Sequence, residues 1–176
     1  MSEEELIDII ASWENLPVMI ELTAKNPDNY RLLVNVALYN SSELSWRAAY
    51  LVDKINVDFP DLLLPYLNAM VKQLEVEKSS GKKRHFLKLI SQHPVDEKHF
   101  GFLVDFCLNT LTSEKEPIAV RVHAMQVLYN ISEIETDLKH ELLLVIEHEM
   151  EFRATAGILT RGRKLAAKLR KQILET

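Results

Sequence analysis

Two stretches decide the fold: Leu63–Leu74, with the sequence LLPYLNAMVKQL, and Phe100–Leu111, with the sequence FGFLVDFCLNTL. They share one apolar pattern, 37 positions apart, and the spacings of three and four residues place the pattern on one face of an α-helix. A third, shorter copy lies 37 positions before the first stretch, at Tyr30, Leu33, Val34 and Ala37. The shared pattern therefore indicates an internal repeat of about 37 residues. In the first stretch its positions are Leu63, Tyr66, Leu67, Met70, Val71 and Leu74.

The helix that follows each apolar stripe keeps the same register. Arg47, Arg84 and Arg121 are also 37 residues apart, and a fourth arginine, Arg161 or Arg163, follows after a slightly longer step. Agreement between two different helices of the unit argues against a chance match. A unit of two helices cannot bury its apolar face alone, so neighbouring units must stack. We therefore expect an all-α solenoid of about five stacked helical hairpins in a single domain, residues 1–176.

Local signals predict ten helices and no strand. Ser2 and Glu5 have the spacing of a capping box, and four prolines lie where helices should begin: Pro17, Pro27, Pro60 and Pro117. No stretch alternates apolar and polar residues over a useful length. The expected helices are 3–12, 15–25, 28–40, 43–56, 60–77, 81–92, 97–112, 117–131, 137–151 and 156–174.

The composition suits a globular chain in a reducing compartment. Of the 176 residues, 47% are hydrophobic and 27% are charged, a balance that does not favour disorder. Cys107 is the only cysteine, which excludes an internal disulfide and a cluster of thiolate ligands. The acidic start, Met1–Glu5, is unlike a signal peptide, and no apolar run is long enough to span a bilayer. We expect a cytoplasmic protein that does not associate with membranes.

Several of these motifs resemble the HEAT repeat family. Glu116–Ala124, with the sequence EPIAVRVHA, resembles the start of the second helix of a HEAT repeat, and Ser45–Ala49 and Arg163–Ala167 are weaker copies. Asp61–Leu67 resembles the first helix, including its internal proline. The resemblance covers residues 28–174 and implies a right-handed α-α superhelix.

The match to the family pattern is interrupted at Lys82–Phe86, where the proline and the small residue are missing. Armadillo and tetratricopeptide units are the alternatives. The tetratricopeptide period is nearer 34 residues, and its Trp-Leu-Gly-Tyr pattern is absent here.

Charge is distributed unevenly along the chain. Residues 1–77 carry 5 Lys/Arg against 13 Asp/Glu, whereas residues 78–176 carry 16 against 13. Two second helices, which line the concave surface of HEAT solenoids, are rich in basic residues. We expect them to form a positive patch that binds an acidic protein segment or a phosphate backbone, although lysines that merely solvate a terminal helix would give the same pattern. The candidate residues are Lys82, Lys83, Arg84, Lys88, Arg161, Lys164, Lys168 and Lys171.

The function that we expect is a non-enzymatic, protein-binding scaffold with no catalytic residue, cofactor or metal. The chain has no glycine-rich phosphate loop, no Gly-x-Ser-x-Gly and no His-Glu-x-x-His. By the resemblance, Arg47, Arg84 and Arg121 should tie neighbouring repeats together rather than contact a ligand. Cys107 lies on an apolar stripe and should be packed and inert.

Nucleic-acid binding is the second hypothesis. Its sharpest form is base excision, because some alkylpurine DNA glycosylases are built from HEAT-like repeats with aromatic residues and a carboxylate in a basic groove. By that resemblance the candidates are Trp46, Tyr50 and Asp53. However, these residues lie in the acidic half of the chain, which would repel phosphate.

Overall fold

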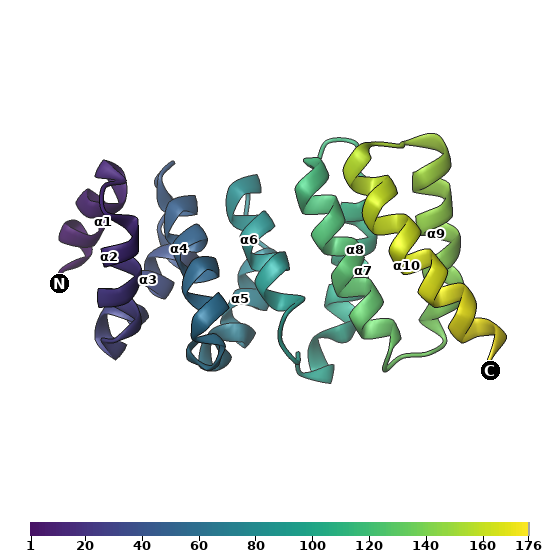
Figure 1. Cartoon of the computed structure of the whole chain (residues 1–176), viewed down its shortest axis with the longest axis horizontal. Helices are drawn as coiled ribbons and strands as arrows, with labels where there is room; N and C mark the ends of the chain where they lie inside the picture. The colour runs from purple at the N-terminus through teal and green to yellow at the C-terminus, as the bar shows by residue number, and fades with distance from the viewer. Residues whose placement is uncertain (176) are drawn as a thin grey trace. The chain divides into compact units, whose positions relative to one another are not determined.

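The computed structural model describes residues 1–175 of the chain, and within them it contains helices and no strand (Figure 1). This confirms the all-α prediction. Thr176, the last residue of the predicted domain, lies outside the described residues. The α-helices are α1 (Glu3–Ser12), α2 (Leu16–Ala24), α3 (Pro27–Tyr39), α4 (Ser45–Asp58), α5 (Leu67–Leu74), α6 (Ser80–Ile90), α7 (Phe100–Thr112), α8 (Ile118–Ser132), α9 (Leu138–Phe152) and α10 (Ala156–Leu174).

The predicted helix boundaries hold to within two residues, except that the predicted helix 60–77 ends at Leu74 and that two helices begin as 3-10 helix. The predicted helix 60–77 is a 3-10 helix, η1 (Pro60–Tyr66), followed by α5, because Pro65 has no N–H and its ring crowds the preceding turn. A short 3-10 helix, η2 (Glu97–His99), likewise precedes α7. At the start of the chain, Ser2 and Glu5 form the predicted capping box.

The described chain forms two compact units, one ending at Leu89 and the other beginning at Ile90. In the first unit α3 packs against α4, and α2 packs against both. In the second unit α7 packs against α8, and α10 packs against α8 and α9. The single domain and the right-handed superhelix stay predictions.

Most positions of the two apolar stripes are buried, whereas Tyr66, Val104 and Leu108 keep partial exposure. Leu63, Met70 and Val71 have no exposed surface, and neither do Leu103 and Leu111 at the matching positions. Burial of each leucine-sized side chain contributes about 1.5–3 kcal/mol, so these stripes account for much of the stability of each unit.

Basic side chains from second helices bind the carbonyl groups at the C-terminal ends of first helices. Arg47 Nη1 donates to the Ile10 and Ala11 carbonyl oxygens at 3.1 and 2.9 Å, one repeat earlier in the sequence. Arg121 Nε donates to the Leu111 carbonyl oxygen at 2.8 Å. Helix ends leave four carbonyls without backbone partners, and a cation is favoured there by the helix dipole. Arg47 and Arg121 therefore have the structural role expected of them.

Arg84, which lies between Arg47 and Arg121 in the 37-residue register, is exposed instead. The equivalent position is taken by Lys82, whose ammonium donates to the Leu38 and Asn40 carbonyl oxygens, each at 3.2 Å. The substitution falls in the segment Lys82–Phe86, where the HEAT pattern is interrupted.

Candidate partner-binding surface

The strongest candidate surface is one face of α10, which we call the basic face: Arg161, Lys164, Lys168 and Lys171. Their spacing of three, four and three residues places them on one side of the helix, and the three lysines are exposed. Lys171 lies 3.8 Å from Glu175 in an exposed pair. Within residues 1–175, neither Lys164 nor Lys168 has a carboxylate oxygen within 4.0 Å. Lys164 and Lys168 are therefore exposed cations without an acidic ion-pair partner in the described chain.

Contacts with α8 fix the orientation of the basic face. Arg161 Nη1 donates to Gln126 Oε1 at 2.6 Å, and Gln172 Nε2 donates to the Tyr129 hydroxyl at 3.2 Å. Lys168 Nζ lies 5.3 Å from the centre of the Tyr129 ring, a cation–π distance. The basic face is therefore carried on a helix held at several points.

A close approach on the other side of α10 holds the helix against α9. A Cβ atom added at Gly162 would lie 2.7 Å from Met150 Sδ, so the absence of a side chain lets the two helices pack closely. Arg170 Nε also donates to Glu147 Oε1 at 2.9 Å. Helix α10 thus packs against α9 on one side and presents the basic face on another.

The basic residues of α6 belong to the first unit and are used differently. Lys82 is only 3% exposed, and its ammonium forms an ion pair with Glu77 at 2.8 Å. Lys88 Nζ lies 2.7 Å from Asp53 Oδ1. Lys83 is half-buried and Arg84 is exposed. Of the four predicted α6 residues, Arg84 is the one fully displayed on the surface, and Lys82 does not belong to an exposed patch.

Asp53, proposed above as a glycosylase carboxylate, is enclosed by its own partners. It is 3% exposed, and its Oδ2 lies 3.0 Å from His85 Nδ1 and accepts a hydrogen bond from Lys88 Nζ at 2.8 Å. Burial raises the pKa of Asp53, but the hydrogen bonds and charges of His85 and Lys88 outweigh burial and lower it. The carboxylate is ionised and already neutralised by its neighbours, which does not suit contact with a substrate.

Trp46 and Tyr50 belong to an aromatic cluster whose third member, Trp13, was not identified from the sequence. Trp13 joins them, with ring centres 6.1 Å from Trp46 and 5.4 Å from Tyr50, and the Arg47 guanidinium lies 4.9 Å above the Trp13 ring. Trp13 ends α1 with a φ of 56°, a conformation that L-residues with bulky side chains rarely adopt. No sequence signal marks a tryptophan in the left-handed backbone conformation, so the contacts of Trp13 with Trp46 and Tyr50 could not have been predicted from the apolar pattern.

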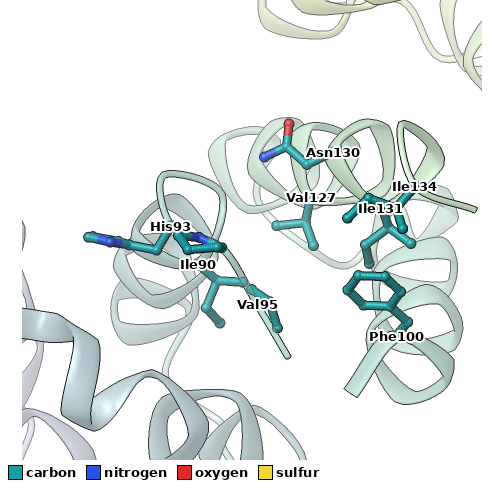
Figure 2. A pocket seen from close by; sticks show the side chains of 9 residues that line it. Ile90, His93, Val95, Phe100, Val127, Asn130, Ile131 and Ile134 are labelled. Atoms are coloured by element: carbon teal, nitrogen blue, oxygen red, sulfur yellow. The ribbon is translucent and has the colours of Figure 1, made fainter. Parts of the chain in front are cut away.

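The second unit also contains an apolar cavity of about 200 Å³ that sequence reasoning missed (Figure 2). Figure 2 shows Val127, Ile131 and Phe100 on one side of it and Ile90 and Val95 on the other. All of its lining residues follow Leu89, so the cavity belongs to the second unit alone. The lining is completed by His93, Pro94, Asn130 and Ile134.

A comparison with protein families identifies the repeat. The model of the HEAT repeat domain matches residues 4–169. The chain belongs to the HEAT repeat family. The match extends the resemblance of residues 28–174 to the first hairpin, and it spans both compact units of this HEAT repeat domain. Comparisons with curated proteins and with solved structures gave no match.

Two kinds of feature were looked for in the described residues of the HEAT repeat domain: a metal site and a membrane-spanning helix. Among residues 1–175, no three His, Cys, Asp or Glu side chains are grouped so that they could hold a metal ion. No helix in the described part of the chain combines the length and apolar character needed to cross a membrane.

Proposed function

We propose that this HEAT repeat domain is a non-enzymatic scaffold that binds a protein partner through the basic face of α10, and that the partner presents an acidic segment. The observation that carries the proposal is the pair Lys164 and Lys168, exposed and without a carboxylate of the described chain nearby. Stacked helical pairs provide extended surfaces suited to protein partners. The proposal places the scaffold in the cytoplasm, where the single thiol stays reduced.

The charge of the two units favours a short acidic segment over a long polyanion. Up to Leu89 the chain carries 10 Lys/Arg against 13 Asp/Glu, and from Ile90 onward it carries 11 against 13. The net charges are −3 and −2, so the apparent asymmetry of the sequence halves disappears once α6 is counted with the first unit. Nucleic acid binding requires many phosphate contacts on a positive surface, whereas an acidic segment needs only the local basic face.

Charge reversal tests the proposal. The variant Lys164→Glu/Lys168→Glu should bind the protein partner at least about tenfold more weakly than the wild-type chain, because two lysines that attract the acidic segment become glutamates that repel it. Less of the partner should therefore be recovered from a lysate of the native host. The matched control is Lys72→Glu/Lys115→Glu, which makes the same change of net charge at exposed lysines elsewhere. The bound proteins are quantified by mass spectrometry, and the eluate is assayed for nucleic acid.

Equal loss of partner in the test and control variants would show that net charge alone governs binding, and recovery unchanged in both would refute the basic face as the binding site. Recovery of nucleic acid at low salt that disappears at moderate salt would replace the protein partner with a phosphate backbone.

A further inference from the structure

The cavity of the second unit is suited to an apolar occupant. Its volume of about 200 Å³ exceeds that of an engineered cavity of roughly 150 Å³ that stays dry and binds benzene. Val127 and Ile131 form part of its wall from α8, and Phe100 does so from α7 (Figure 2). Such walls do not offer the several polar partners that an ordered water needs.

One polar side chain of the cavity lining, Asn130, is already bonded. Asn130 Nδ2 donates to the Ser91 carbonyl oxygen at 2.7 Å, and Asn130 Oδ1 accepts from Gln126 Nε2 at 2.8 Å. Asn130 therefore holds the segment after α6 against α8 and keeps the edge of the cavity in place. Ile134, also on the edge, is 58% exposed, so the cavity is reached from solvent past an apolar residue.

Side chains of α8 connect the cavity to the basic face. Arg161 bonds to Gln126, Gln126 bonds to Asn130, and Asn130 lines the cavity. Tyr129, which lies under Lys168, is the chain neighbour of Asn130. Hydrogen bonds along α8 thus connect the basic face with a residue of the cavity lining.

We infer that the cavity accepts one bulky apolar side chain, of the size of Phe or Leu, carried by the acidic segment that the basic face binds. The inference rests on the proposed function and adds to it the sequence chemistry of the partner: acidic residues beside one large apolar residue. The volume holds a single side chain, which excludes the whole apolar face of a partner helix. Buried apolar anchors of this kind supply much of the energy at protein interfaces, whereas exposed charges mainly steer association.

Two labelled peptides test the inference by fluorescence anisotropy: a short glutamate-rich peptide with one central Phe, and the same peptide with Ala in its place. The Phe peptide should bind the wild-type chain about tenfold more tightly, because the ring leaves water on binding. Val127→Phe, which fills the cavity from its wall, should abolish this preference and leave binding of the Ala peptide unchanged. Val145→Phe on α9, outside the cavity lining, is the control and should keep the preference.

A second variant protects the test against a folding defect. Ile134→Gln changes an exposed residue at the edge of the cavity and should reduce the preference for Phe without loss of fold. Equal binding of the two peptides by the wild-type chain, or a preference that survives Val127→Phe, would overturn the apolar anchor and leave the basic face intact. Failure of both peptides to bind would overturn the acidic partner itself, and the anchor with it.

Discussion

Glu149 should be the most damaging position in the second unit at which to remove a single charge. Its side chain has no exposed surface, and its Oε2 and Oε1 accept from Arg121 Nη2 at 2.5 Å and Arg153 Nη1 at 2.9 Å. Glu149→Gln keeps the shape but leaves Arg121, itself 5% exposed, without a buried counter-charge. Breaking such a pair by removing one partner costs about 3–5 kcal/mol. A chain of this length loses about 2–4 °C of Tm per kcal/mol, so Tm should fall by about 6–20 °C.

The control lies on the same helix. Glu147 pairs with Arg170, and both side chains are partly exposed, so Glu147→Gln should cost no more than about 1 kcal/mol. Thermal unfolding by circular dichroism measures the total effect, and hydrogen exchange of α8 and α9 against α3 and α4 assigns it to the second unit. Equal, small shifts for the two variants would refute the claim that the buried pair holds α8 and α9 together.

Three further predictions concern stability and reactivity. Arg47→Ala should destabilise the first unit by about 1–3 kcal/mol and speed hydrogen exchange in α1, since carbonyls at its end lose their donor, whereas Arg84→Ala should change stability by less than about 0.5 kcal/mol. The pKa of Asp53 is lowered in the folded state, so its contribution to stability should be complete above about pH 4 and lost as the pH falls below that value. In urea titrations across this pH range, the free energy of unfolding should depend less on pH for Asp53→Asn than for the wild-type chain. Burial raises the pKa of the Cys107 thiol, so a disulfide reagent should modify it at the rate of unfolding, and rapid labelling of the native chain would contradict its burial.

The sequence predicts the helices well because their signals are local and repeated. The stripe of Leu63 and Met70 recurs at Phe100 and Cys107 in the same 37-residue register, and a helix places all of these residues on one face, where they are buried. Pro65 shows the limit of such signals: it lies within the 3-10 helix η1, which an apolar pattern does not distinguish from α-helix.

The binding surface is less predictable, because the role of a charge depends on its neighbours in space. Lys82 and Lys164 are both lysines in second helices, yet Lys82 is buried against the carbonyls of α3 and Lys164 is exposed. Sequence spacing gives the face of a helix but not the partner that a basic side chain meets. The cavity has no signature either, because it depends on how the segment after Ile90 returns to α8, which Asn130 fixes through the Ser91 carbonyl.

The most direct test of the scaffold proposal is a quantitative recovery experiment at moderate salt with wild-type chain, Lys164→Glu/Lys168→Glu and the Lys72→Glu/Lys115→Glu control. We expect one protein to be recovered in stoichiometric amount by the wild type and the control and to be lost from the Lys164→Glu/Lys168→Glu variant. Recovery of that protein by all three chains would contradict the basic face of α10 as the site at which this HEAT repeat domain binds its partner.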